Sequence, residues 1–480
     1  MKAIFATSDL VLLGAYYALL VALAVYGLHR YALVRLRRKF SAAGRAAPPV
    51  PEVWPDLTVQ LPIFNEPCVA ARLVDAAAAL CYAGRLHIQV LDDSDDETTA
   101  IIAERVAAHR REGVSIDHVQ RRKRSGFKAG ALAHGLGLTA SELIAVFDAD
   151  FVPPADLLER MVPWFADADV GMVQARWGHL NRDDSALTRA QAIYLDAHFA
   201  VESAARCFSG RFFNFNGTAG IWRRRAIDEA GGWSDATLTE DLDLSYRAQL
   251  AGWRFVFLPD VEVPAELPGT IAAFHSQQRR WAKGSLQTAR RILPRIVARA
   301  GLPLATKVEA FFHLTNNIAY LLTLLLALLM VPALALRHLS GIGWSLVIDA
   351  ALFLASTISV VAFYVEGQRQ VGRRLSAREI LAVLPVGIGM SVVNAAAVLE
   401  GLFQRGGYFS RTPKSGGRAG LVTLDRFDHL PVAESLLSLF FLVSLGLFFK
   451  QGHFVAMPFV LLFLSGYGQV VAATLIERFR

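Results

Sequence analysis

Long apolar runs lie at both ends of the chain, and shorter ones alternate with polar stretches between them. The first run, LVLLGAYYALLVALAVYGL at 10–28, is long enough to cross a bilayer as a helix. A basic segment, HRYALVRLRRKF, follows it, whereas a cleaved signal sequence carries its basic residues before the apolar core. We therefore expect a retained membrane helix whose C-terminal end faces the cytosol.

Apolar runs return in the C-terminal third of the chain, at 317–336, 343–365, 378–403, 433–449 and 453–475. The loops on either side of the run 378–403 are both basic, and basic loops tend to stay in the cytosol. That run also contains Pro385, Asn394 and Glu400, so we expect it to lie along the interface or against the other helices. The pattern predicts about five spanning helices, with the amino terminus outside and the carboxyl terminus inside.

Between the membrane segments, short β-branched runs alternate with helix-like stretches. These runs are LTVQLPI at 57, HIQVLDD at 87, LIAVFDAD at 143, VGMVQARW at 170, GTAGIW at 217 and RFVFLPD at 254. Strands separated by helices predict a mostly parallel α/β sheet with helices on both faces, and ligands bind such sheets beyond the carboxyl ends of the strands. The expected parts of the chain are a membrane helix with its basic flank at 1–42, a linker at 43–56, a soluble domain at 57–300, and membrane and interfacial helices at 301–480.

Composition supports this division, because charged residues make up only 19% of the 480 residues and concentrate between positions 30 and 310. The net charge of +7 resides largely in short basic clusters beside apolar runs. Membrane topology accounts for such clusters, so they do not indicate a nucleic-acid partner. The expected partner of these segments is the lipid bilayer.

Acidic residues follow two of the expected strands. In VFDAD, Asp148 and Asp150 occupy alternate positions, so on a strand both carboxylates would face one cation. One or two carboxylates together with substrate phosphates are the usual ligands of Mg²⁺ or Mn²⁺. In QVLDDSDDE, Asp92 and Asp93 can accept hydrogen bonds from a nucleobase or ribose. The alternative for Asp148 and Asp150 is a solvated strand end, and the alternative for Asp92 and Asp93 is a polar turn.

A third acidic element, TLTEDLDLSYRAQLAGW, places Glu240 and Asp241 at the start of a helical pattern. A carboxylate there can act as the general base that takes a proton from an attacking hydroxyl. Helix capping is the alternative for these residues. Paired carboxylates also serve glycoside hydrolases, which need no divalent ion.

Further candidates follow in HSQQRRWAKGSLQ, where Gln277, Arg280 and Trp281 combine an amide, a guanidinium for a diphosphate and an aromatic face for a sugar. A basic helix on the bilayer surface is the alternative. Lys128 in GFKAGAL is another cation for a donor. An acceptor surface is expected from Phe213, Asn214, Asn216 and Trp222, with core packing as the alternative for the phenylalanines.

Seven motifs, in this order along residues 57–290, resemble those of the family 2 glycosyltransferases with a GT-A fold. They are QLPIFNE at 60, QVLDDSDD at 89, GFKAGAL at 126, the Asp-x-Asp at 148, NFNGTAG at 214, TEDLDLSYRA at 239 and Gln-x-x-Arg-Trp at 277. Within the family the chain most resembles the cellulose synthase-like A and C enzymes, which are glucomannan and mannan synthases, and their bacterial relatives.

The resemblance implies an inverting, metal-dependent hexosyltransferase that adds a sugar from GDP-mannose or UDP-glucose to a growing β-glycan. Asp92 or Asp93 would contact the nucleotide, Asp148 and Asp150 the metal diphosphate, and Asp241 would be the base. Gln277, Arg280 and Trp281 would bind the donor and the glycan.

A further motif, YFSRTPK at 408–414, is similar to the gating loop of processive synthases and lies in a cytosolic loop expected at 404–420. Its phosphate-reaching residues would be Thr412 and Lys414. The expected enzyme is an integral membrane protein of a bacterial inner membrane or its equivalent, with a cytosolic catalytic domain. A non-processive glycolipid synthase with a lipid acceptor is the alternative, a catalytically dead transporter a remote one, and a homo-oligomer or accessory subunits stay open.

Overall fold

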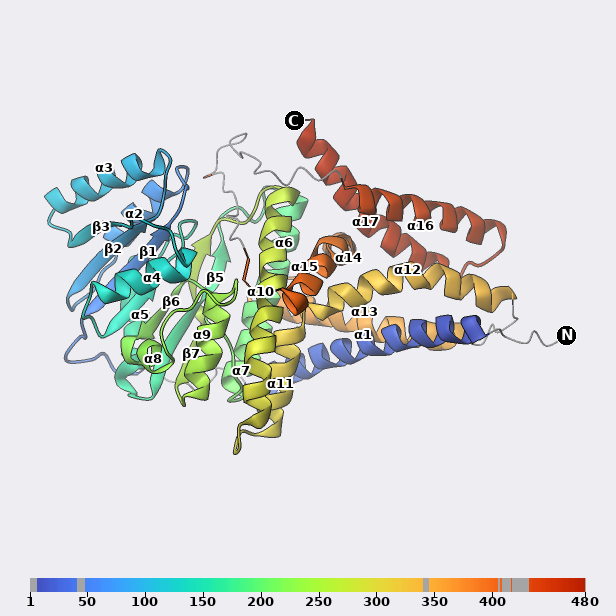
Figure 1. The fold of residues 1–480 in the computed structure, drawn as a ribbon, viewed down its shortest axis with the longest axis horizontal. Helices are drawn as coiled ribbons and strands as arrows, with labels where there is room; N and C mark the ends of the chain where they lie inside the picture. The colour runs from blue at the N-terminus through green and yellow to red at the C-terminus, as the bar shows by residue number, and fades with distance from the viewer. Residues whose placement is uncertain are drawn as a thin grey trace.

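The computed structural model describes residues 7–40, 48–339, 345–404, 406–407, 416 and 431–479. A sheet domain forms one half of the molecule, and a bundle of long helices forms the other (Figure 1). Helix α1 (Thr7–Lys39) runs from the far end of the bundle back to the sheet domain. Thr412 and Lys414, with most of the loop expected at 404–420, lie outside the described residues.

A seven-stranded sheet organises the sheet domain, with the order β3-β2-β1-β4-β6-β5-β7. Only β6 runs against its neighbours, so the sheet is mixed and mostly parallel, as expected. The strands are β1 (Leu57–Ile63), β2 (Leu86–Asp92), β3 (Ile116–Gln120), β4 (Leu143–Val146), β5 (Val170–His179), β6 (Gly220–Arg223) and β7 (Arg254–Ala265). The polar edge strand β3 was not among the expected strands.

Apolar side chains cover both faces of this sheet. On β4, Leu143 and Ala145 belong to one buried cluster while Ile144 and Val146 belong to another, because successive residues of a strand point to opposite faces. The covering helices are α2 (Ala70–Ala78), α3 (Thr98–Arg111), α4 (Phe127–Gly137), α5 (Leu157–Met161), η1 (Val162–Ala166), α6 (Ala186–Ala197), η2 (His198–Ser203), α7 (Ala204–Phe208), α8 (Arg224–Glu229) and α9 (Glu240–Leu250).

Within the described residues, five helices are long and apolar enough to cross a membrane, and a bent pair makes up to six. The five are α1, α12 (Ile318–Leu339), α13 (Ser345–Gln370), α16 (Val432–Lys450) and α17 (Met457–Arg478). The pair is α14 (Ala377–Gly389) and α15 (Ser391–Phe403), bent by 44°. The bend falls inside the run 378–403, which we expected to lie along the interface or against the other helices.

Two further helices separate the halves. Helix α10 (Ile271–Ala298) lies across the ends of the long apolar helices, and α11 (Leu304–Thr315) follows it (Figure 1). Polar contacts fasten the sheet domain to the bundle: Arg182 donates to Asp196 at 3.0 Å and to Gln368 of α13 at 2.9 Å. Arg37 of α1 donates to the Ala200 carbonyl at 2.9 Å. The domain is therefore held directly against the helices.

Candidate active site

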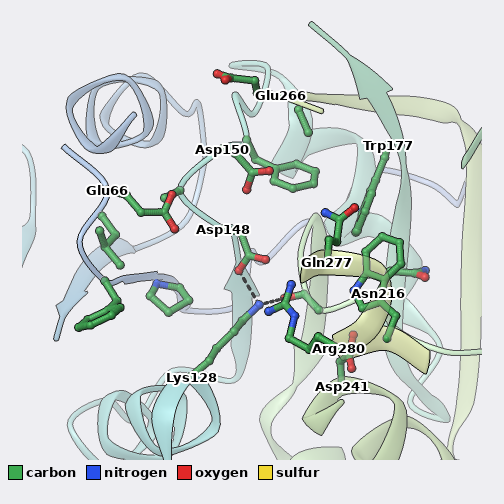
Figure 2. Close-up of a pocket in the computed structure, with 18 of the residues that line it drawn as sticks. Glu66, Lys128, Asp148, Asp150, Trp177, Asn216, Asp241, Glu266, Gln277 and Arg280 are labelled. Carbon is green, nitrogen blue, oxygen red and sulfur yellow. Dashed lines mark hydrogen bonds and ion pairs between the residues drawn. The ribbon is translucent and has the colours of Figure 1, made fainter. Parts of the chain in front are cut away.

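A pocket of about 150 Å³ opens where the carboxyl ends of the parallel strands meet α9 and α10. Figure 2 shows its carboxylates around Lys128 and Arg280. The wall combines residues that follow β1, β2, β4, β5 and β7, which is the edge where open α/β sheets bind ligands. Its charged or aromatic members include Glu66, Asp93, Lys128, Asp148, Asp150, Trp177, Glu240, Asp241, Glu266, Arg280 and Trp281.

Asp148 and Asp150 both line this pocket, but they lie in a turn rather than on a strand, because β4 ends at Val146. Strand alternation is therefore not the reason that they share the site. The turn is fixed by the Asp148 backbone N–H, which donates to the Thr218 hydroxyl at 2.9 Å.

Lys128, near the start of α4, contacts the same turn. Its Nζ donates to Asp148 Oδ1 at 2.5 Å and to the Gly217 carbonyl at 2.8 Å. Burial and the neighbouring Asp150 raise the pKa of Asp148, although Lys128 works in the opposite direction. A cation that joined this site would find concentrated negative charge with little competing water.

The donor set of the two aspartates fits a hard divalent ion, since both side chains offer carboxylate oxygens to one pocket (Figure 2). Among the described residues, no group of three or more His, Cys, Asp and Glu side chains is arranged to hold a metal alone. An ion here would therefore complete its shell with substrate oxygens, which is the usual arrangement for Mg²⁺.

Helix α9 begins at Glu240, so Glu240 and Asp241 project from its first turn. The side chain of the preceding Thr239 makes no cap hydrogen bond, and the capping alternative therefore does not explain that residue. Burial and the adjacent Glu240 raise the pKa of Asp241 to about 7. A carboxyl group with this pKa can exchange a proton near neutral pH.

The remaining expected residues divide between the wall and the interior. Asn216, Gln277, Arg280 and Trp281 line the pocket. Trp177 of β5 also lines it, with its ring centroid 6.5 Å from that of Trp281, and we did not expect this residue from the sequence.

Asp92 and Asp93 have separate surroundings although they are adjacent in the chain. Asp93 lines the pocket and pairs with Arg121. Asp92 is buried and accepts hydrogen bonds from the Ser94 backbone N–H at 2.9 Å and the Thr99 hydroxyl at 2.9 Å. His118 Nε2 lies 2.8 Å from Asp92 Oδ2, the oxygen that the Thr99 hydroxyl also contacts. Asp92 therefore shapes the loop after β2 and is not part of the pocket wall.

The expectation that Phe213 and Trp222 form part of an acceptor surface was wrong. Both are almost completely buried, in the cluster that covers one face of the sheet. Asn214 and Asn216, from the same segment, do face a cavity. Glu66 and Glu266 line the pocket as well; Glu66 is the last residue of the motif QLPIFNE, just after β1, although we did not single it out as a site residue.

A second cavity, of about 440 Å³, continues from this pocket into the helix bundle. Residues of α1, α12, α13, α14 and α17 line it together with α6, η2 and α10. The two cavities share the wall residues Trp177, Leu195, Asn216, Thr239, Asp241, Gln277 and Trp281. The space beside Asp241 therefore opens toward the membrane helices.

The fold and this constellation of carboxylates define the catalytic half as a glycosyltransferase domain of the GT-A type. Residues 55–284 match the family model described as "Glycosyltransferase like family 2". This part of the chain belongs to that family.

Relatives and a solved structure agree with the assignment. Glucomannan 4-beta-mannosyltransferase 1 of Oryza sativa subsp. japonica is 41% identical over 292 residues, covering 58% of this chain and 56% of the relative. Glucomannan 4-beta-mannosyltransferase 2 of Arabidopsis thaliana is 42% identical over 280 residues, covering 56% and 52%. The chain thus spans just over half the length of these curated relatives. The mannosyltransferase PcManGT from Pyrobaculum calidifontis, solved in complex with GDP-Man and Mn²⁺, shares the fold with a TM-score of 0.56 and 22% identity, over 82% of this chain and 99% of that one.

Proposed function

We propose that this protein transfers a hexose, from GDP-mannose or UDP-glucose, to the end of a growing β-glycan with inversion at the anomeric carbon. The names of the relatives favour mannose, whereas the pocket residues do not select between the two donors. The GT-A fold, the carboxylates at the edge of the sheet and the similarity to glucomannan mannosyltransferases support this proposal.

In the proposed reaction, Asp241 accepts the proton of the attacking acceptor hydroxyl. Its pKa of about 7 suits that role, because a base works best when its pKa is near the working pH. Arg280 and Lys128 contribute positive charge beside the leaving diphosphate. Trp177 and Trp281 offer flat faces on which a sugar ring can stack. Asp93 lines the pocket just after β2, and we propose that it contacts the nucleotide.

Asp148 and Asp150 are proposed to hold Mg²⁺ or Mn²⁺ when the donor binds. When bound, this ion would neutralise the negative charge that develops on the departing diphosphate. Lys128 would remain beside the diphosphate of the donor as a positively charged side chain, because its Nζ already contacts Asp148.

The shared wall of the two cavities is the observation that carries the proposal of a polymer product. A glycan that leaves Asp241 has a route lined by polar and aromatic side chains between the membrane helices. The basic C-terminal turn of α1, with Arg37, Arg38 and Lys39, lies on the side of the sheet domain and supports a cytosolic catalytic half.

The test is incubation of the purified protein in nanodiscs with a panel of nucleotide sugars and Mg²⁺ or Mn²⁺. The proposal expects nucleotide release, a ladder of β-linked oligosaccharides and loss of both with EDTA. A single sugar attached to lipid would replace polymer synthesis with glycolipid synthesis. Hydrolysis without transfer, or activity that EDTA leaves unchanged, would contradict the proposed reaction.

A further inference from the structure

A π-helix, η2, interrupts the helical stretch between α6 and α7, at the junction of the pocket and the membrane cavity. Such wide turns are rare, and they are found frequently at functional sites. Three of its residues, His198, Phe199 and Glu202, line the cavity. None of these residues has a part in the reaction proposed above.

The hydrogen bonds around Asn216 fix which end of its amide faces His198. Asn214 Nδ2 donates to the Phe215 carbonyl at 3.0 Å and to Asn216 Oδ1 at 3.1 Å. Asn216 Nδ2 in turn donates to the Asn214 carbonyl at 3.3 Å. The reverse orientation of Asn216 would place two NH₂ groups against each other and two oxygens against each other. Asn216 therefore presents Oδ1 to His198.

The ring of His198 lies between two acceptors. Its Nε2 is 2.9 Å from Asn216 Oδ1, and its Nδ1 is 3.0 Å from Glu202 Oε2. A neutral imidazole donates from only one nitrogen, whereas the imidazolium donates from both. The two contacts are satisfied together when His198 carries both protons and Glu202 is a carboxylate.

The buried groups behind Glu202 agree with this protonation state. Arg206 of α7 contacts Glu202 at 3.4 Å and donates to Glu309 of α11 at 2.9 Å; Arg206 and Glu309 are buried, and Glu202 is half-buried. Burial disfavours the charged carboxylate, but Arg206 and His198 outweigh it and hold the pKa of Glu202 well below its usual range. With a charged His198, the two carboxylates face two cations, so the cluster is electrically balanced.

The other titratable groups in this cluster leave that balance unchanged. Burial and Arg206 hold the pKa of His313 well below its usual range, so His313 is neutral, with its Nδ1 2.7 Å from the Tyr246 hydroxyl. His29 of α1 lies 3.0 Å from Glu309 through Nε2 and can donate to it as a neutral ring. Among the histidines of this cluster, His198 is thus the one whose two ring nitrogens both face hydrogen-bond acceptors.

We propose that His198 is an acceptor-positioning residue, which Glu202 keeps doubly protonated and which holds the Asn216 amide at the junction of the two cavities. The second N–H of that amide, which takes no described partner, is offered to a hydroxyl of the uncharged glycan whose end reaches Asp241. His198 and Glu202 lie on the same side of η2, because residues four apart are neighbours on a helix surface. This inference rests on the proposed glycosyl transfer.

The test compares His198→Phe, which keeps a flat ring but removes both donors, with the exposed-histidine control His134→Phe on α4. Calorimetry in nanodiscs measures binding of a β-linked manno-oligosaccharide and, separately, of GDP. We expect His198→Phe to weaken oligosaccharide binding by about tenfold or more, as the loss of a charge-assisted hydrogen bond would, and GDP binding by less than about twofold. Glu202→Gln, which leaves a neutral ring that still donates once, should give a smaller loss.

Unchanged oligosaccharide binding in His198→Phe, equal weakening of GDP binding, or absence of oligosaccharide binding by the unmodified protein would each overturn the inference. Failure of the proposed function has a different signature: the unmodified protein would bind the oligosaccharide and GDP but transfer no hexose. ¹⁵N spectroscopy adds a readout that a structural role would not move. Both ring nitrogens of His198 should be protonated in the resting enzyme, and this signal should be missing from His198→Phe and altered in Glu202→Gln.

Discussion

Asp241 has a carboxylate neighbour, Glu240, and little contact with solvent, and this environment makes its protonation sensitive to pH near neutrality. Its pKa is raised to about 7 by burial and by Glu240. The base must be ionised, so the rate of transfer should rise with pH through about 7 and level off above it. A pH profile of kcat/KM at saturating metal checks this expectation, and a profile that is flat between about pH 6 and pH 8 would contradict it.

Asp241→Asn should lose transfer by about 10²–10⁴-fold while it still binds nucleotide, because only the proton acceptor is removed.

The same variant, Asp241→Asn, should be more thermostable than the unmodified protein above about pH 7. The raised pKa means that ionising Asp241 costs folding free energy, and this cost appears as the pH rises through that value. Tm measured in nanodiscs at low and high pH checks the sign. A lower Tm for Asp241→Asn at high pH would point to a structural role.

Asp148→Ala and Asp150→Ala should each weaken metal-dependent nucleotide binding by about tenfold or more, because hard ions depend on carboxylate ligands. Titration of GDP binding with Mn²⁺ and with EDTA measures this effect. The exposed Asp156→Asn serves as the matched control, since it lies just beyond the same turn. Normal Mn²⁺ dependence in either alanine variant would remove that residue from the metal site.

Sequence reasoning at this scale brought Asp148, Asp150 and Asp241 to one pocket, and it failed where neighbouring elements decide the orientation of a side chain. Position in the chain cannot distinguish Asp92 from Asp93, because His118 and Thr99, which bury Asp92, come from other elements. Aromatic residues such as Phe213 and Trp222 are typical both of binding surfaces and of cores, and here packing against the sheet buries both side chains. Trp177 had no motif to mark it.

At the scale of elements, apolar periodicity predicted six of the seven strands and all five separate spans. Strand β3 was missed because its sequence, IDHVQ, is polar and lies at the edge of the sheet, where only one neighbour pairs with it. The reversed direction of β6 was also beyond the pattern, since alternation along one strand does not record which way its partners run. The bend between α14 and α15 agrees with the polar residues and proline of that run.

The loop between α15 and α16 supports one prediction at this scale. Its motif YFSRTPK resembles a segment that closes over the nucleotide, so Lys414→Ala should slow turnover several-fold through loss of a phosphate contact, while Tm is unchanged. The control is Lys450→Ala, at the end of α16. It is more suitable than Gln404→Ala, at the start of the loop, because Gln404 accepts a hydrogen bond from Lys283 at 3.0 Å. Equal turnover in the Lys414 and Lys450 variants would contradict the loop's proposed role.

At the scale of the molecule, the catalytic pocket and the cavity in the bundle share one wall, and α10 carries residues of both across the boundary (Figure 1). Sequence analysis predicted each half from its own pattern. The continuity between the halves depends on contacts between distant segments, such as Trp177 of β5 facing Trp281 of α10. A one-dimensional pattern does not contain such contacts.

Product length is the measurement that tests this continuity most directly. Gly387 of α14 lines the membrane cavity, and a side chain there would start 3.6 Å from the Tyr194 hydroxyl on the same cavity wall. Gly387→Trp should therefore shorten the oligosaccharides made from nucleotide sugar at least several-fold, while transfer of a first hexose to a short acceptor continues. Gly446→Trp on α16, where an added Cβ meets nothing within 4 Å, should leave the product length unchanged. Products of equal length from both variants would contradict passage of the glycan between the membrane helices.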